Sequence, residues 1–286
     1  MRKLLLIDSH ALIHRLFHGM PPLTTEDNEP VGAIYGLCQL LIKIVREEQP
    51  DYIAACFDRP EPTFRKQEFE AYKATRAATM PDIIPQLIES RSTFAAFGIP
   101  VYELAGYEAD DLIATIVENY KDTPDLQIVI LSGDRDLLQL VVDEKVVADM
   151  IKSGASEVDR YNEEAVIAKY ELRPDQIPDL KGLMGDASDN IPGVPNVGQK
   201  TATLLLKDFG SVEGVYENLV IIPEKHAKKL EGNKEQALLS KRLATVERAA
   251  PIELNGLEAV TAKEFDKERL SAYFKKFGFA SLVDRI

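Results

Sequence analysis

Acidic residues are concentrated in the stretch Gly106-Tyr107-Glu108-Ala109-Asp110-Asp111, which places three carboxylates within four residues directly after an apolar segment. Two like charges about 4 Å apart repel by roughly 4 kcal/mol at an effective dielectric constant near 20. A whole domain is stabilised by only about 5 to 15 kcal/mol. One acidic residue would suit the positive end of the helix predicted for Asp110 to Tyr120. Three carboxylates so close together indicate a bound cation.

Other apolar runs in the chain also end in acidic residues. Lys3 to Asp8, Tyr52 to Asp58 and Leu126 to Ser132 are predicted strands, and Gly133-Asp134-Arg135-Asp136 follows the third. Further strands are expected at Pro100 to Leu104 and Lys145 to Met150, with helices between them at Gly32 to Glu47 and Pro85 to Phe97. This alternation predicts a mostly parallel sheet with helices on both faces. Ligands of such sheets bind beyond the carboxyl ends of the strands, so the acidic residues expected at that edge are Asp8, Asp58, Glu108, Asp110, Asp111, Asp134 and Asp136.

An all-oxygen site of high negative charge favours hard cations, so we expect Mg²⁺, with Mn²⁺ as a substitute, rather than Zn²⁺. A zinc alternative exists in His10, His14 and His18, which are spaced to share one helix face. No cysteine lies nearby, and we therefore interpret them as surface or groove histidines. Arg15 on the same helix is expected to face Asp8 or a phosphate.

A basic and aromatic segment follows Pro60 and Pro62. Its sequence predicts a helical stretch with Arg65, Phe69, Tyr72 and Arg76 on one face and Lys66 and Lys73 beside it. Cations that hold phosphates and rings that stack on bases are typical of a site for single-stranded nucleic acid. The alternative is a solvated charged face with the two aromatic rings packed inward, and the segment by itself favours neither interpretation.

After about residue 172 the predicted strands stop and the chain is expected to be helical. Asp186 and Asp189 are two more acids able to face the cluster, and a glycine- and proline-containing turn that opens a helix follows them. Such a turn brings free backbone N–H groups to a phosphate. The residues of this candidate site are Gly193, Val194, Pro195, Asn196, Val197, Gly198, Gln199, Lys200 and Thr201. Lys225 to Arg242 holds six Lys or Arg against two Glu, a patch for duplex backbone or a solvated helix surface.

Composition limits the class of protein. The chain has 286 residues, 45% of them hydrophobic, and no run approaches membrane-spanning length. Its net charge of -13 points away from nucleic acid unless much of that charge belongs to one metal site. Cys38 and Cys56 lie in apolar segments and are expected to be buried reduced thiols, which favours a cytosolic protein.

Taken in order, these motifs resemble those of the flap endonuclease and 5′-3′ exonuclease family, most closely the 5′-nuclease domain of bacterial DNA polymerase I. The resemblance extends from Lys3 to Ile286 and rests on the Asp-ended first strand, Phe57-Asp58, the stretch from Gly106 to Asp111, that from Gly133 to Asp136, and that from Met184 to Gly193. All nine acidic residues of the family pattern have a counterpart. They are Asp8, Asp58, Glu108, Asp110, Asp111, Asp134, Asp136, Asp186 and Asp189.

The resemblance implies an α/β fold in two parts. Residues 1–172 would form a PIN-like metal-dependent nuclease core with a mobile helical arch at about 59–85. Residues 173–286 would form a helical helix-three-turn-helix region that grips duplex DNA and is able to hold K⁺. Tyr72, Lys73 and Arg76 match the arch motif, and Phe64 and Arg65 match a Phe-Arg pair expected to bind DNA.

The implied activity is that of a structure-specific 5′-3′ exonuclease and flap endonuclease with a two-metal mechanism. Its substrates would be DNA with a 5′ flap or 5′ end, including RNA-primed fragments, in primer removal and repair. Lys73 and Arg76 would stabilise the phosphate charge in the transition state, and Tyr72 would stack on a base. We expect a bacterial, cytoplasmic, nucleoid-associated monomer, alone or linked to a polymerase. The tighter metal site would use Asp8, Asp58, Glu108, Asp110 and Asp111, and the looser one Asp134, Asp136, Asp186 and Asp189.

The chain departs from the family pattern at a few places outside the metal ligands. Ser9 and Asn196 replace frequent glycines, Arg59 to Pro62 lacks the usual lysine and glycine, and Ala77 to Met80 is one residue longer. We expect these changes to affect the arch and substrate preference. Two other functions are compatible with the acids: a non-catalytic structure-specific DNA-binding protein, and a phosphatase with Asp134 as nucleophile. The phosphatase hypothesis assigns no role to the basic segment or to the turn at 193–201.

Overall fold

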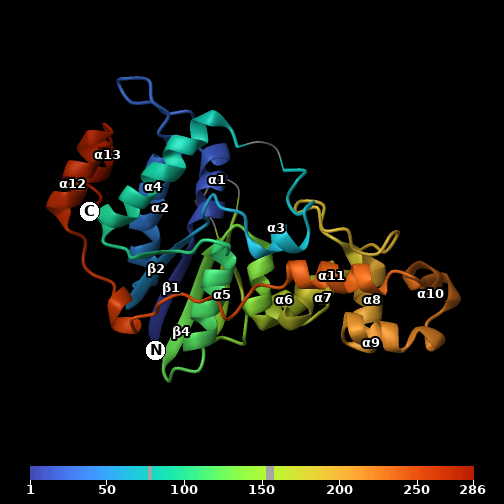
Figure 1. The fold of residues 1–286 in the computed structure, drawn as a ribbon. Coiled ribbons are helices and arrows are strands. Elements are labelled where there is room, and N and C mark those ends of the chain that lie inside the picture. The colour runs from blue at the N-terminus through green and yellow to red at the C-terminus, as the bar shows by residue number, and fades with distance from the viewer. Residues whose placement is uncertain (77–78, 153–157) are drawn as a thin grey trace.

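The computed structural model describes residues 1–76, 79–152 and 158–286 (Figure 1). Strands and helices alternate in the first part of the described chain, and only helices follow β6. The strands are β1 (Arg2–Asp8), β2 (Tyr52–Phe57), β3 (Val101–Glu103), β4 (Leu126–Ser132), β5 (Val146–Ile151) and β6 (Val158–Tyr161). The helices are α1 (Ser9–Gly19), α2 (Gly32–Glu48), α3 (Phe64–Glu68), α4 (Ile84–Phe97), α5 (Ala109–Tyr120), α6 (Glu163–Tyr170), α7 (Ile177–Met184), α8 (Gln199–Phe209), α9 (Val212–Glu217), α10 (Glu224–Leu230), α11 (Lys234–Ala244), α12 (Lys267–Lys276) and α13 (Ala280–Val283). Short 3₁₀ helices are η1 (Pro81–Ile83), η2 (Arg135–Leu140), η3 (Pro174–Gln176), η4 (Leu219–Ile221) and η5 (Leu257–Val260).

The strands form one six-stranded sheet in the order β3-β2-β1-β4-β5-β6. All neighbours pair in parallel except β5 and β6, which are antiparallel. The prediction of a mostly parallel sheet is confirmed, and the sequence analysis missed only the antiparallel edge strand β6. Because β2 and β4 flank β1 on opposite sides, the connections reverse direction at β1, and the crevice for a ligand opens at this point.

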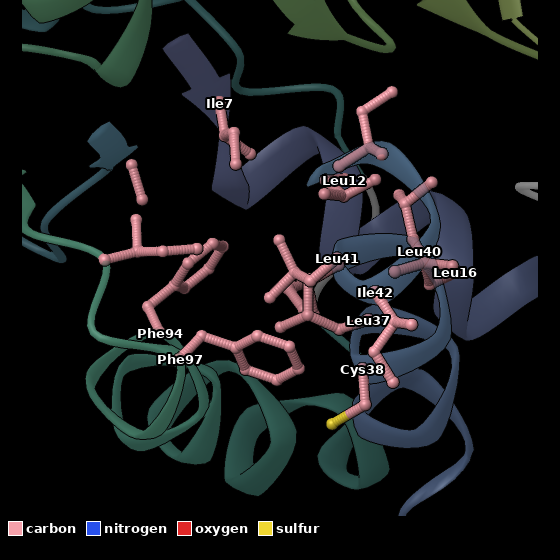
Figure 2. Close-up of a cluster of buried hydrophobic side chains, with 14 of the residues drawn as sticks. Ile7, Leu12, Leu16, Leu37, Cys38, Leu40, Leu41, Ile42, Phe94 and Phe97 are labelled. Atoms are coloured by element: carbon pink, nitrogen blue, oxygen red, sulfur yellow. The ribbon is translucent and has the colours of Figure 1, made fainter. Parts of the chain in front are cut away.

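Side chains of β1 alternate between two cores, as the pleat of a strand requires. Leu4 and Leu6 face the core that includes α5, whereas Leu5 and Ile7 face the core of α1, α2 and α4. Figure 2 shows the second core, where Leu37 of α2 lies near Phe94 and Phe97 of α4. Helices on both faces thus bury the central strands and fix the positions of their ends.

The prediction of a helix that carries a basic and aromatic stripe is wrong beyond the first turn of this segment. Helix α3 ends at Glu68, and Phe69 takes an extended conformation with φ of -143°. Lys73 has a positive φ of 54°, which no α-helix contains. The helix does not continue because residues 71–73 bind the loop that carries Asp189, as described below. Ala77 and Ala78 of the predicted arch lie outside the described residues.

The predicted second unit, residues 173–286, divides in the structure. Helices α7, α8 and α9 surround a separate small core that includes Leu183, Leu206 and Val215. From Val246 onward, the chain returns to the sheet, and Phe274 of α12 is buried in the core of α2 and α4. Figure 1 shows α12 and α13 beside α4, at the opposite end of the molecule from α10. The apolar side of α12 covers core surface that would otherwise face water.

Two smaller expectations concern the cysteines and the length of the helices. Cys38 and Cys56 are buried and unbonded to each other, which confirms the prediction of free thiols. In the described part of the chain, no helix has the length and apolar character needed to cross a bilayer.

Candidate active site

A cleft of about 970 Å³ opens at the carboxyl ends of β1, β2 and β4. Residues from distant parts of the sequence line it, and eleven of the predicted site residues are among them. The predicted residues that it brings together are Asp8, Arg15, Asp58, Lys73, Arg76, Glu108, Asp110, Asp134, Asp136, Asp186 and Gln199. The predicted gathering of acids at one sheet edge is therefore seen in the structure.

The end of β4 joins two of these acids across the point where the sheet connections reverse. Ser132 Oγ lies 2.5 Å from Asp8 Oδ2, and it also accepts the backbone N–H of Asp134 at 2.8 Å. Asp8 caps α1 as well, because its Oδ1 accepts the N–H of Ala11 at 3.1 Å. These bonds hold Asp8 and Asp134 at fixed places on adjacent strand ends.

Asp58 binds the start of α5 in a similar way. Its Oδ1 accepts the N–H of Ala109 at 2.6 Å, next to Asp110. We call Asp8, Asp58, Asp110 and Asp134 the open carboxylates, because none of them forms an ion pair with Lys or Arg among the described residues.

Burial and mutual repulsion raise the pKa values of two open carboxylates, Asp8 and Asp110. Burial, with Asp58 and Asp134 adding to it, raises the pKa of Asp8 to about 7. Burial also raises the pKa of Asp110, and Asp8 and Asp134 are the next causes. Carboxylates that repel one another this strongly fit a divalent cation bound between them, since its charge would reverse the repulsion.

A second set, which we call the paired carboxylates, consists of Glu108, Asp136, Asp186 and Asp189. Lys73 Nζ lies 2.9 Å from Glu108 Oε1 and 3.8 Å from Asp189 Oδ2. Arg76 Nη2 donates to Asp189 Oδ1 at 2.5 Å. Two predicted catalytic cations thus neutralise two predicted metal ligands.

Lys181 neutralises the other two paired carboxylates by binding both Asp136 and Asp186. Burial raises the pKa of Asp136 to about 7, with Asp134 adding to this and Lys181 opposing it. Burial also opposes ionisation of Asp186, but Lys181 and Ser188 outweigh it and hold its pKa at about 2. The sequence analysis assigned Lys181 no role, although a lysine within the apolar pattern of α7, five residues before Asp186, is a usable signal.

The structure places Asp111 away from the cleft, contrary to the prediction that it is a metal ligand. Arg65 Nη2 and Nη1 bind its two carboxylate oxygens at 2.7 and 2.8 Å. The backbone N–H groups of Glu108 and Glu247 bind the same oxygens at 2.9 and 2.8 Å. Asp111 is fully buried and both of its carboxylate oxygens accept hydrogen bonds from the protein, so in this conformation it does not face the cleft.

The same contact corrects the assignment of Arg65 to DNA binding, because its side chain is only 3% exposed. Phe64 is half-buried, with the guanidinium groups of Arg65 and Arg242 over its ring. This predicted Phe-Arg pair therefore connects α3 to α5 and α11 in the structure.

Tyr72 is 4% exposed, so in this conformation its ring is not available to stack on a base. Its hydroxyl lies 3.1 Å from Glu108 Oε2 and 3.2 Å from Asp189 Oδ2. The backbone N–H of Lys73 binds the carbonyl of Asp189 at 2.9 Å, and Asn190 Nδ2 binds the carbonyl of Ala71 at 2.7 Å. The segment Ala71–Lys73 is thereby docked on the loop that carries Asp189, which explains its departure from a helix.

The predicted phosphate-binding turn divides into buried and exposed residues. Gly193 is buried with φ of 59°, and a Cβ there would lie 2.1 Å from the backbone N of Gly185. Val194 and Val197 pack in the small helical core. Thr201 is half-buried, and the exposed members are Pro195, Asn196, Gly198, Gln199 and Lys200. Only this exposed part, at the start of α8, is accessible to a phosphate.

Three histidines and Arg15 line the same cleft. Burial lowers the pKa of His14 to about 4, and His10 Nδ1 lies 3.9 Å from Asp58 Oδ2. Arg15 Nη2 donates to the carbonyl of Gly133 at 3.3 Å, so it supports the loop before Asp134. Throughout residues 1–76, 79–152 and 158–286, no three His, Cys, Asp or Glu side chains stand in a metal-binding arrangement. The paired carboxylates must exchange Lys or Arg for a metal before they can act as ligands.

The chain matches two consecutive family descriptions. Residues 3–171 match the 5′-3′ exonuclease N-terminal resolvase-like domain, and residues 172–268 match the 5′-3′ exonuclease C-terminal SAM fold. The chain is 42% identical over 286 residues to DNA polymerase I of Bacillus caldotenax, a match that covers 100% of this chain and 32% of that protein. It thus spans about a third of the length of this relative.

Two solved structures share the fold. T5 5′-exonuclease with bound zinc is 21% identical, with a TM-score of 0.71, and the match covers 97% of this chain and 99% of that chain. The catalytic core of Rad2 in complex with DNA substrate is 16% identical, with a TM-score of 0.62, and the match covers 96% of this chain and 87% of that chain.

Proposed function

Because this chain belongs to the 5′-3′ exonuclease family, we propose that it hydrolyses DNA phosphodiesters at 5′ single-stranded flaps and 5′ ends, including those of RNA-primed fragments. The observation that carries this proposal is the set of open carboxylates at the carboxyl ends of β1, β2 and β4. Four acids without an ion-paired cation destabilise a folded protein, and a role in binding catalytic metal ions would explain why they are grouped here.

Divalent ions, Mg²⁺ by preference and Mn²⁺ as its substitute, would be held by the open carboxylates together with Glu108. Asp136, Asp186 and Asp189 would contribute to a second ion after they exchange their cations. We place Asp134 with Asp8 instead of in the second set, because Ser132 joins the two. Bound ions would polarise the phosphodiester and lower the pKa of a water molecule. The T5 structure, which contains zinc, supports divalent-metal chemistry in this fold.

Lys73 and Arg76 would move from Glu108 and Asp189 to the phosphate, where they would stabilise charge that develops in the transition state. Tyr72 would become able to stack on a base only when the segment Ala71–Lys73 leaves the loop at Asp189. The assignment of these three as catalytic residues thus requires a change from the conformation seen here.

The exposed residues at the start of α8 would hold the duplex arm through backbone N–H groups, and the turn would also bind K⁺. The Rad2 structure with DNA supports this use of the fold. We further propose a monomeric nuclease of the bacterial cytoplasm and nucleoid, acting in replication and repair, with a polymerase covalently attached in the full-length protein. The bacterial DNA polymerase I relative supports this part.

A gel assay tests the proposal directly. DNA with a labelled 5′ flap is incubated with the protein in Mg²⁺ or in EDTA, and product lengths are read. We expect a Mg²⁺-dependent product released near the flap junction. A flap that is bound but never cut in Mg²⁺ or Mn²⁺ would instead establish a non-catalytic DNA-binding protein.

Two substitutions test the division of roles. Lys73→Ala should mainly lower turnover, because it removes a cation from the phosphate. Asp189→Ala should mainly raise the Mg²⁺ concentration needed for half-maximal cleavage. Identical effects of both variants in a metal titration would contradict the assignment.

A further inference from the structure

The cleft contains five Lys or Arg side chains, and four of them have partners. Arg15 binds the carbonyl of Gly133, Lys73 and Arg76 bind the paired carboxylates, and Lys181 binds Asp136 and Asp186. Arg135 is different. Among the described residues, it has no hydrogen bond, ion pair or ring contact, although it is exposed and lines the cleft.

The absence of an ion pair is notable because Arg135 stands between two acidic residues. Asp134 caps η2 and accepts the backbone N–H of Asp136 at 2.9 Å, while the carboxylate of Asp136 is bound by Lys181. Both acids are therefore directed into the site by other contacts. Arg135, the first residue of η2, faces the solvent of the cleft, and no protein group among the described residues binds its five N–H donors.

The 3₁₀ helix η2, which begins at Arg135, packs against η3 and α7 at the start of the helical region. Tyr170 and Gln199 line the same cleft, and Gln199 opens α8 directly after the turn that is proposed to bind duplex backbone. Lys73 and Arg76 belong to the arch segment instead. Arg135 is thus a cation of the nuclease core that shares a cleft with the start of the helical region.

We propose that Arg135 binds a backbone phosphate of the duplex arm, between the open carboxylates and the start of α8, and so positions the duplex for cleavage. This inference rests on the proposed function. A guanidinium group is planar and weakly hydrated and matches two phosphate oxygens at once. It also supplies local positive charge where the open carboxylates would repel a phosphodiester. Arg135 is a positioning residue in this account, since it acts outside the reacting atoms.

The test compares Arg135→Gln with Arg46→Gln, which makes the same charge change elsewhere. Arg46 is exposed in the last turn of α2. That turn lies near the amino end of β1, because Glu48 binds Lys3 Nζ at 2.9 Å there, at the opposite edge of the sheet from the cleft. Thermal midpoints of both variants should equal that of the parent protein.

Binding of flap DNA is measured in EDTA, where no cleavage occurs, over a series of salt concentrations. We expect Arg135→Gln to weaken binding about five- to tenfold, which is roughly the affinity that one phosphate contact contributes. The slope of log affinity against log salt should become shallower by about 0.9, the value for one phosphate contact. Arg46→Gln should change neither quantity, and Arg135→Lys should retain the slope.

Two comparisons complete the test. The weakening should also be seen with a duplex that lacks a flap, and in Mg²⁺ it should raise KM more than it lowers kcat. Equal behaviour of Arg135→Gln and Arg46→Gln, in a protein that binds and cuts flaps, would overturn the role of Arg135 alone. A loss confined to single-stranded DNA would overturn its assignment to the duplex arm. Failure of the parent protein to bind flap DNA would overturn the proposed function and this inference together.

Discussion

The open and the paired carboxylates occupy one cleft but are neutralised in opposite ways. Among the described residues, the open set forms no ion pair with Lys or Arg, although Lys73 and Arg76 line the same cleft. The paired set lies where the arch segment and α7 approach, so that Lys73, Arg76 and Lys181 reach it. The difference indicates that a metal at the paired set would compete with cations of the protein, whereas at the open set it would meet no ion-paired Lys or Arg among the described residues. At neither set do three described side chains already stand in a metal-binding arrangement.

The largest expected effect is on catalysis by the open set. Asp110→Asn should reduce Mg²⁺-dependent flap cleavage by at least about a thousandfold, because metal catalysis is worth several kcal/mol and each 1.4 kcal/mol is tenfold. The thermal midpoint in EDTA should stay the same or rise, since one member of a repelling group is removed. Asp122→Asn, at an exposed position just after the end of α5, is the matched control and should leave both unchanged.

The next largest effect is expected on stability, at the buried ion pair of Arg65 and Asp111. Arg65→Met should lower the free energy of unfolding by about 3 to 5 kcal/mol, because it leaves Asp111 buried without its cation. Urea denaturation measures the change. Arg173→Met breaks the exposed pair with Asp175 and should cost at most about 1 kcal/mol. Similar losses in the two variants would show that burial of the first pair does not matter.

A smaller effect should appear in the pH dependence of stability. The pKa of Asp8, raised by burial and by Asp58 and Asp134 to about 7, means that the folded chain binds this proton more tightly than the unfolded chain. The contribution of Asp8 to the free energy of unfolding in EDTA is therefore full below about pH 4 and is lost as the pH rises to about 7.

The measurement is a set of urea titrations of the parent protein and of Asp8→Asn across that range. The free energy of unfolding of the parent protein, relative to that of Asp8→Asn, should fall as the pH rises from about 4 to about 7. Mg²⁺ should stabilise the parent protein more at about pH 8 than at about pH 5. A difference that rises with pH would contradict the description of Asp8 as an open carboxylate.

The smallest expected effect tests competition at the paired set. Arg76→Gln should raise the affinity for Mn²⁺ in the absence of DNA by a factor of about two to five, because one cation leaves Asp189 and this partly exposed pair is worth at most about 1 kcal/mol. Isothermal titration calorimetry measures the affinity. Arg59→Gln, which breaks the exposed pair with Glu61 in the same segment, should have no effect. An unchanged or lower affinity in Arg76→Gln would show that the arch cations do not compete with metal.

Local sequence patterns were sufficient for the sheet and for the edge on which the acids gather. Apolar runs that end in Asp8 and Asp58 predicted buried parallel strands, and the carboxyl ends of such strands must share one edge. The start of α5 was predicted to within one residue for the same reason, since a helix period shows in a short window. The family resemblance added the expectation that the turn at 193–201 binds duplex DNA.

Neutralisation of the acids was decided only by the tertiary structure. Asp110 and Asp111 are adjacent in sequence, but successive helix residues point about 100° apart, so one enters the cleft and the other meets Arg65. The docked conformation of Tyr72 and the pairing of Asp189 with Arg76 likewise depend on residues more than a hundred positions away. A sequence determines by itself which groups carry charge and which strand ends they follow. The approach of an opposite charge depends on packing between distant segments, which no local pattern encodes.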